Sequence, residues 1–409
     1  MTATAQAARR GPRPLGLHLA TAQAMWLGSL NALPLLNGKW PTWLATSQPE
    51  AWHALERHVA DLPADDLFSA VEWAVRQRAD RFLTGLERYR HHAYRRELAE
   101  PPVLWHEGQT RILDYGPQGG RPLLVVPSLI NRGYVLDLSA RRSFLRWLAG
   151  QGVRPLLVDW GSPDAGERGF DLTDYIAGRL ERALNAVLEA ADGPVPVLGY
   201  CMGGLLATAL AARRTQDVSA LVLMATPWDF HADDPESAKR VAALYAVWRV
   251  WVQGLGLLPV DAIQTLFMAL DPLLAIKKFS HFADMDPDGP DAEAFVALED
   301  WLNDGVPLAA RVAETCLSDW YGLNSPATGT WRVAGLPVDP RSLDLPSLHL
   351  IPARDRIVPP ASARALAMSM PGSDIIEPPL GHIGMVVSGA AKPHVWAVVA
   401  EWLNKLPAR

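Results

Sequence analysis

Short apolar segments that alternate with helical patterns constrain the fold of this chain more than any other feature. Four of them have the length and continuous apolar character typical of strands buried on both faces. They are PLLVVP from Pro122, RPLLVDW from Arg154, VPVLGYC from Val195 and SALVLMATP from Ser219. Strands joined by helices predict a mostly parallel sheet flanked by helices, with right-handed crossovers.

The alternation stops after residue 227 and resumes after residue 343. We therefore predict a helical N-terminal extension over 1–100, the first part of an α/β core over 101–227, a helical cap over 228–343 and the second part of the core over 344–409. The cap is expected over the carboxyl ends of the strands, where open α/β sheets bind ligands. Its tryptophans suit an apolar channel as well as ordinary packing: Trp248, Trp251, Trp301, Trp320 and Trp331.

Composition excludes several classes of protein. The net charge is -6 and no basic block is present, so we expect no nucleic-acid partner. The two cysteines, Cys201 and Cys316, cannot form a disulfide framework, which favours a reducing compartment and hence the cytoplasm. We expect Cys316, in a helical stretch, to be buried and inert.

An uncharged segment from Leu15 to Gly38 follows three arginines near the N-terminus. A signal peptide and a membrane span are the alternatives to a surface helix. Polar residues and Pro34 interrupt the segment, so we favour an amphipathic helix that rests on the domain, a partner or a hydrophobic surface, and expect no transmembrane span. Its apolar side is predicted to hold Leu19, Ala22, Trp26, Leu30 and Leu33.

The spacing G-x-C-x-G, from Gly199 to Gly203, places Cys201 between a strand and a helix. This is the context of a nucleophile elbow, whose sharp turn presents a reactive side chain at the top of a sheet. The glycines relieve crowding where strand and helix approach each other. The N-terminus of the helix favours a thiolate, and the amide of Met202 can stabilise an oxyanion.

A thiol nucleophile needs a base and a group that orients the base, in the chain order nucleophile, acid, histidine for this kind of sheet. His382 follows the strand SDIIEPP, and Asp355 follows the strand SLHLIPA. His382 would take the proton and Asp355 would fix its tautomer. Asp159 competes as the acid but precedes Cys201, while Asp137 is expected to order the loop after PLLVVP.

The loop after PLLVVP should supply the second oxyanion amide, from Leu129 or Ile130. Asn131 either contacts substrate or caps the loop backbone. The sequence has no glycine-rich phosphate loop and no histidine and cysteine cluster at metal spacing, so neither a cofactor nor a metal is expected.

Several separated segments resemble one family, the polyhydroxyalkanoate synthases, which are acyltransferases of the α/β-hydrolase fold. The segments are VPSLINRGYVLDL, GVRPLLVDWGSP, LGYCMGG, ATPWDF, ARDRIVPPASARAL and LGHIGMVVSGAAK. The last two look most like the short, class III synthases that work with a second subunit. The resemblance implies a triad of Cys201, Asp355 and His382 and polymerisation of (R)-3-hydroxyacyl-coenzyme A with release of coenzyme A. It also implies a polyester granule surface and a second subunit or a second copy of the chain as partners.

Two other functions fit the same residues. A thioesterase or intracellular polyester depolymerase would use the same triad, because water can take the acyl group from the same acyl-enzyme. A non-enzymatic, granule-associated subunit would use the N-terminal helix and the aromatic cap instead.

Overall fold

The computed structural model describes residues 9–32, 50, 54, 57–58 and 62–407, which fall into two compact units. The sheet unit comprises Arg95–Leu270 and Asp304–Arg409, and the helical unit comprises Met1–Tyr94 and Asp271–Asn303. Residues 271–303, which the sequence placed in the cap, therefore group with the N-terminal residues.

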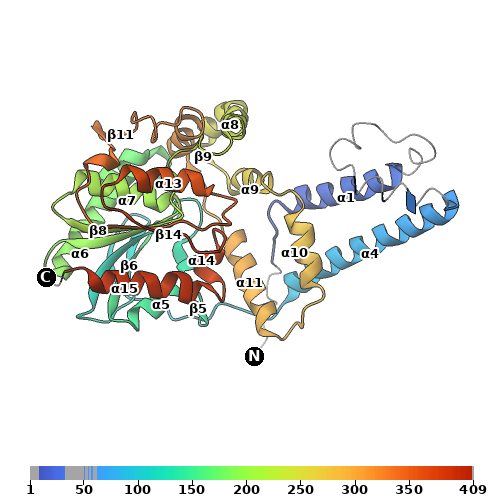
Figure 1. Cartoon of the computed structure of the whole chain (residues 1–409), viewed down its shortest axis with the longest axis horizontal. Coiled ribbons are helices and arrows are strands. Elements are labelled where there is room, and N and C mark those ends of the chain that lie inside the picture. The colour runs from blue at the N-terminus through green and yellow to red at the C-terminus, as the bar shows by residue number, and fades with distance from the viewer. Residues whose placement is uncertain (1–8, 33–49, 51–53, 55–56, 59–61, 408–409) are drawn as a thin grey trace. The chain divides into compact units, whose positions relative to one another are not determined.

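One sheet of eight strands forms the centre of the sheet unit, and its order is β1-β2-β6-β3-β7-β8-β13-β14 (Figure 1). The strands in this order are Val103–Glu107, Thr110–Asp114, Val153–Asp159, Arg121–Val126, Val195–Tyr200, Val218–Met224, Ser347–Leu350 and Asp374–Ile376. Strands β1 and β2 form a hairpin, β2 runs antiparallel to β6, and all later pairs are parallel. The prediction of a mostly parallel sheet is confirmed.

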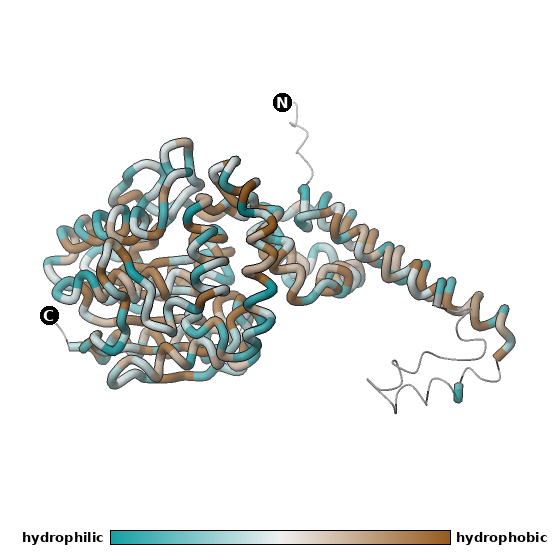
Figure 2. Tube along the Cα trace, turned by 90° about the horizontal axis from the view of Figure 1, so that it is seen from above, coloured by the Kyte–Doolittle hydropathy of each residue, from teal (hydrophilic) through white to brown (hydrophobic). Residues whose placement is uncertain are grey.

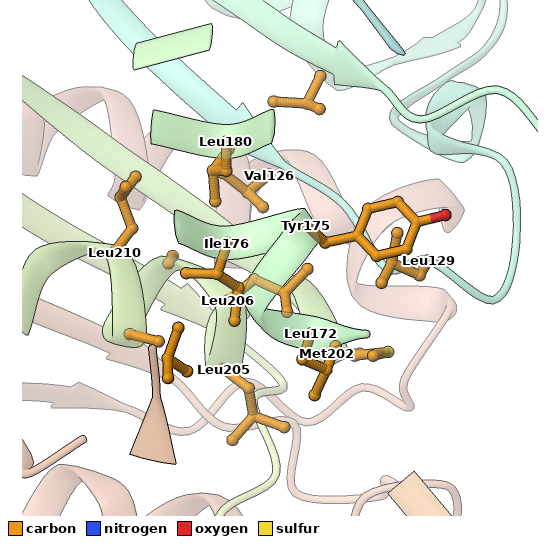
Figure 3. Packing of buried hydrophobic residues seen from close by; sticks show 14 of the residues in the cluster. Val126, Leu129, Leu172, Tyr175, Ile176, Leu180, Met202, Leu205, Leu206 and Leu210 are labelled. Atoms are coloured by element: carbon orange, nitrogen blue, oxygen red, sulfur yellow. The ribbon is translucent and has the colours of Figure 1, made fainter. Parts of the chain in front are cut away.

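Helices cover both faces of the sheet (Figure 1). One face carries α5 (Phe144–Ala149) and α15 (Ala397–Lys405), and the other carries α6 (Glu181–Ala191), α7 (Met202–Arg213) and α13 (Pro360–Ser369). A π-helical turn, Asp174–Leu180, leads into α6. Side chains of this turn and of α7 pack into one buried apolar cluster (Figure 3).

Helix α5 covers only part of the segment SARRSFLRWLAGQG, residues 139–152, because it begins at Phe144. Residues Asp137–Ser139 and Arg142–Ser143 form the short antiparallel pair β4 and β5 instead. Asp137 is fully buried and accepts hydrogen bonds from Arg96 and Arg146. A buried carboxylate must be paired, so these ion pairs hold the segment extended ahead of the helix.

The part of the cap that belongs to the sheet unit begins with α8, Pro235–Leu255. The Asp234 side chain accepts a hydrogen bond from the Ser237 amide, and Gly256, at φ 72°, ends the helix. This start and end are typical of stable helices. The elements that follow are β9 (Leu257–Leu258), α9 (Val260–Met268), β10 (Leu308–Ala309), α12 (Ala310–Glu314) and the π-helical turn Thr315–Trp320.

The helical unit contains α1 (Leu15–Ala32), α4 (Ala64–His91), α10 (Leu274–Phe282) and α11 (Pro290–Asn303). Apolar and polar positions alternate along its long helices (Figure 2). Its core is a cluster of buried side chains that includes Ala22, Phe82, Tyr89 and Phe279. Gly85 lies against the Phe279 carbonyl, where a larger residue would overlap the backbone. This contact explains why residues 271–303 pack with α4.

The N-terminal helix α1 is confirmed, but its packed side differs in part from the predicted one. Ala22 is buried and Trp26 packs against the core, whereas Leu19 is 37% exposed and Leu33 lies outside the described residues. Within the described part of the chain, no helix combines the length and the apolar character that a membrane span requires.

Candidate active site

Cys201 occupies the turn between β7 and α7 with backbone angles φ 56° and ψ -129°. A positive φ is unfavourable for any residue with a Cβ atom and persists only where its surroundings impose it. Here the Cys201 amide donates to the Met224 carbonyl over 2.9 Å, and the Cys201 carbonyl accepts from the Gly204 amide over 2.9 Å. The backbone on both sides thus fixes the strained turn that the sequence predicts.

Glycines make this turn possible. A methyl group on Gly203 would overlap the Val126 carbonyl oxygen, and one on Gly199 would overlap the backbone of Gly204. Both glycines of the G-x-C-x-G spacing are therefore needed, as predicted. The structure adds Gly204, where a methyl group would overlap Thr226. The doubled glycine after Met202 was the only sequence signal for that position.

The three residues predicted for the triad lie together. His382 Nδ1 is 2.7 Å from Asp355 Oδ2, and Cys201 is near enough to the His382 ring to influence its pKa. The second carboxylate oxygen, Oδ1, accepts from the amides of Ile357 and Val358 over 2.8 and 2.9 Å. His382 and Asp355 are buried, and Cys201 is half-buried. Because Nδ1 faces the carboxylate, Nε2 is the ring nitrogen available to the sulfur.

Electrostatics at the site favour a charged imidazole. Burial opposes the charge, but the neighbouring Cys201 and Asp355 outweigh burial and raise the pKa of His382 above its ordinary value. A ring that holds its proton between a sulfur and a carboxylate is the expected partner of a thiolate.

Tyr200 contacts His382 through both its hydroxyl group and its ring, and the sequence did not predict these contacts. Its hydroxyl donates to the His382 carbonyl over 3.1 Å, and the two ring centroids are 5.4 Å apart. Burial, together with Cys201 and Asp355, raises the pKa of Tyr200 well above its ordinary value, so the phenol keeps its proton. The only available signal was the tyrosine directly before the cysteine.

The sequence predicts the second oxyanion amide from Leu129 or Ile130, in the loop after β3, and only one of these two amides lacks a hydrogen-bond partner among the described residues. The Ile130 amide donates to Ser128 Oγ over 3.0 Å, whereas no hydrogen bond from the Leu129 amide occurs within the described residues. The Met202 amide likewise has no partner in that part of the chain. Leu129 and Met202 are thus the available oxyanion donors, while the amide of Ile130 is already engaged.

Residues 304–306 pair with the same loop. The Val306 amide donates to the Ile130 carbonyl over 3.2 Å, and Arg132 Nε lies 3.0 Å from Asp304 Oδ1. Asn131 forms an isolated bridge with Gly305, and its side-chain oxygen is buried without a hydrogen-bond partner. The Asn131 oxygen therefore does not cap the loop backbone, and a contact between Asn131 and substrate stays a prediction.

Side chains nearly fill the space beside Leu129. The gap that remains has room for about one water molecule, and Trp160, Tyr175, Leu308 and Val312 contribute to its walls. Leu129 and Tyr175 also belong to the cluster that contains Met202 (Figure 3). The loop after β3 is therefore packed closely against the core next to the elbow helix.

The competing residues have other partners. Asp159 pairs with Arg111 over 2.7 Å. Cys316 is buried, and burial raises the pKa of its thiol above the ordinary value, which keeps the thiol protonated. Among residues 9–32 and 62–407, no three histidine, cysteine, aspartate or glutamate side chains are arranged to hold a metal ion.

A family model of the alpha/beta hydrolase fold matches residues 121–388. The chain therefore belongs to the alpha/beta hydrolases, as the sheet order and the elbow indicate. Among solved structures it is similar to an alpha/beta hydrolase fold protein from Nakamurella multipartita, with 19% identity, a TM-score of 0.45 and coverage of 75% of this chain and 99% of that one.

Within that superfamily the chain belongs to the poly(3-hydroxyalkanoate) polymerases, which are acyltransferases. It is 31% identical over 294 residues to the poly(3-hydroxyalkanoate) polymerase subunit PhaC of Allochromatium vinosum, covering 69% of this chain and 81% of that protein. It is 30% identical over 293 residues to the subunit of the same name from Synechocystis, covering 69% and 78%.

Proposed function

We propose that the protein polymerises (R)-3-hydroxyacyl groups from coenzyme A thioesters into a polyester through a covalent acyl-cysteine on Cys201. The observation that carries the proposal is the contact series Cys201, His382 and Asp355 at a nucleophile elbow, in a chain that belongs to the polymerase family. Coenzyme A is part of the substrate in this reaction, and no cofactor or metal takes part.

Acyl transfer to the enzyme exchanges one thioester for another. The Cys201 sulfur gives its proton to His382 and attacks the thioester carbonyl carbon. A new carbon–sulfur bond forms, the bond to the coenzyme A sulfur breaks, and coenzyme A leaves with the proton from His382. We propose that the amides of Met202 and Leu129 hold the carbonyl oxygen as it becomes negative, and the support is that neither amide has a hydrogen-bond partner among the described residues.

Chain growth uses the same groups. His382 accepts the proton of a 3-hydroxyl group, whose oxygen attacks the carbonyl carbon of the acyl-cysteine. An ester bond forms, the carbon–sulfur bond breaks, and the Cys201 sulfur regains the proton from His382. Asp355 stabilises the imidazolium in both steps and fixes its orientation.

We further propose that the protein acts in the cytoplasm at the surface of polyester granules, with a second subunit or a second copy as partner. The support is that the relatives from Allochromatium vinosum and Synechocystis are themselves named as polymerase subunits. Co-sedimentation of the purified chain with polyester granules tests the granule contact. Protein that stays in the supernatant would contradict it.

The decisive test of the reaction is product analysis with (R)-3-hydroxybutyryl-coenzyme A. The wild-type protein should release free thiol and form a turbid polyester, and Cys201→Ala should do neither. Release of monomeric 3-hydroxybutyrate without polymer would instead identify a thioesterase. Breakdown of added polyester granules would identify a depolymerase.

A further inference from the structure

Two segments of the cap are joined by hydrogen bonds next to the nucleophile. The first segment, 228–231, directly follows the loop after β8, and the second, 321–324, follows the π-helical turn. The side-chain nitrogen of Asn324, Nδ2, donates to Asp229 Oδ1 over 2.8 Å, and Asn324 Oδ1 accepts from the backbone amide of Phe230 over 3.0 Å. We call this pair of bonds the Asp229–Asn324 latch. It connects positions that lie about a hundred residues apart in the sequence.

Asn324 itself has two unusual properties. Its backbone is left-handed, with φ 55°, and its side chain is buried. A glycine would satisfy that backbone without strain, so the conformation alone does not require an asparagine. Both polar atoms of the side-chain amide take part in the latch instead, because the nitrogen donates to Asp229 and the oxygen accepts from Phe230.

The latch fixes two aromatic rings. The Phe230 and Tyr321 ring centroids are 4.9 Å apart, and His231 Nε2 is 2.8 Å from the Tyr321 carbonyl oxygen. Both rings are half-buried and, like Cys201, they pack against the same apolar core. We call Phe230 and Tyr321 the aromatic wall.

The aromatic wall lies close to the elbow, because the Cys201 amide donates to the carbonyl of Met224, which ends β8 four residues before segment 228–231. Burial raises the pKa of the Tyr321 phenol to about 12, with a smaller contribution from Cys201. The Tyr321 hydroxyl makes no hydrogen bond to any described residue, so the position of this ring depends on packing and on the contacts of its backbone, which include the His231 bond.

We propose that Asn324 is a positioning residue, which holds the aromatic wall beside Cys201 and thereby decides whether an acyl-cysteine reacts with a hydroxyl group or with water. The proposal rests on the proposed function and names the residues that protect its intermediate. Two fates of that intermediate differ only in the attacking oxygen. A 3-hydroxyl oxygen forms an ester and extends the chain, whereas a water oxygen forms a carboxylic acid. In each case the carbon–sulfur bond breaks and the attacking group's proton returns through His382 to the sulfur.

When the aromatic wall is in place, an apolar surface covers the acyl-cysteine and keeps water away from its thioester. Loss of the latch removes two hydrogen bonds that favour the closed arrangement. The population of open enzyme should then rise by about tenfold, and the ratio of hydrolysis to chain growth should rise with it.

The test compares Asn324→Gly with the wild-type protein, using (R)-3-hydroxybutyryl-coenzyme A and measuring released thiol, monomeric acid and polymer. Glycine keeps the left-handed backbone and removes only the latch. Asp192→Gly is the matched control, because Asp192 has the same φ of 55° and is exposed at the end of α6. We expect about a tenfold higher ratio of acid to polymer for Asn324→Gly and an unchanged ratio for Asp192→Gly.

A merely structural role for Asn324 would reduce acid and polymer in the same proportion, which leaves their ratio unchanged and overturns the proposal. Tyr321→Ala, which removes the ring and keeps the latch, must raise the ratio as well, and it decides the matter if Asn324→Gly does not fold. A wild-type protein that releases no thiol would contradict the proposed function rather than this inference. A polymerising wild type whose variants keep its product ratio would contradict only this inference.

Discussion

The two carboxylate oxygens of Asp355 have separate tasks. Oδ1 is held by two backbone amides of the loop that follows β13, and Oδ2 meets the His382 ring at 2.7 Å. The loop thus orients the carboxylate, which in turn orients the base. This arrangement was predictable, because strand-end positions and chain order single out Cys201, Asp355 and His382. Tyr200 and Asn324 were not, since their partners come from segments remote in the sequence.

Asp355→Asn should lower the rate of coenzyme A release by about a thousandfold, because an amide favours the wrong tautomer of His382. Asp355 is one of the groups that raise the pKa of His382, so its replacement should lower that pKa. The alkaline limb of the pH profile should therefore move to lower pH. Stopped-flow thiol release across pH measures both effects, with exposed Asp344→Asn as the control. An unmoved alkaline limb would show that Asp355 does not act on the imidazolium.

His349, inside β13, makes stability depend on pH. It is 2% exposed, and burial lowers its pKa from the ordinary 6.5 to about 4. Between pH 6.5 and about pH 4, His349 therefore binds a proton in the unfolded chain but not in the folded chain. Stability from this residue is complete above pH 6.5 and falls as the pH drops toward 4, by up to about 3 kcal/mol.

His349→Asn should remove that share of the acid sensitivity. Urea unfolding at pH 7 and pH 5 measures the difference in the free energy of unfolding, which should shrink in this variant. The exposed histidine in His394→Asn should leave the difference as it is in the wild type. Equal pH sensitivity of all three proteins would mean that His349 takes up its proton as readily in the folded state.

At the scale of elements, the strands followed from their apolar character, and the exceptions have local causes. Helix α5 begins only at Phe144, because Asp137 pairs with two arginines and the residues before the helix are extended. The π-helical turn Thr315–Trp320 left no periodic signal, because its i to i+5 bonds shift only one turn of a helical pattern. Elbow geometry, in contrast, was predictable because glycine spacing records close backbone approach directly.

Gly203→Ala tests whether the elbow requires a close backbone approach at Gly203. The added methyl group would meet the Val126 carbonyl and Pro127, which are backbone atoms at the end of a central strand and cannot move aside. We expect destabilisation of about 2–4 kcal/mol and loss of polymer formation. Thermal unfolding and thiol release are the measurements.

Gly254→Ala is the matched control for the elbow variant. Gly254 is exposed within α8, and nothing lies within 4 Å of the position that its methyl group would take. This change should raise stability by about 0.5–1 kcal/mol through helix propensity alone. If Gly203→Ala behaved like Gly254→Ala, the close contact between α7 and the end of β3 would not constrain the elbow.

At the scale of the whole molecule, the division into two units could not be predicted. Residues 271–303 lie within the predicted cap in sequence, but α10 and α11 share a core with α4. The contacts that join them span about two hundred residues, for example the Phe82 and Phe279 rings at 6.4 Å. Helical periodicity gives the packed face of each helix and says nothing about its partner.

Arg9 should stabilise the helical unit selectively. Its guanidinium pairs with Asp300 at 2.6 Å and donates to the carbonyl of His92, just beyond the end of α4. The Arg9 side chain is 9% exposed, so its replacement would leave a carboxylate and backbone carbonyls without their cation. Arg9→Met should therefore destabilise this unit by about 2–3 kcal/mol. Arg10→Met, at an exposed neighbour, is the matched control.

Hydrogen exchange read element by element distinguishes the units. In Arg9→Met, amides of α1, α4, α10 and α11 should exchange faster, by about thirtyfold or more for the slowest of them, while those of β3 and β7 keep their protection. Selective loss would show that α10 and α11 unfold with the N-terminal helices and not with the remainder of the cap. Equal loss in both units would mean that they unfold as one cooperative body. Faster exchange in α1 and α4 alone would mean that α10 and α11 unfold with the rest of the cap, as the sequence predicted.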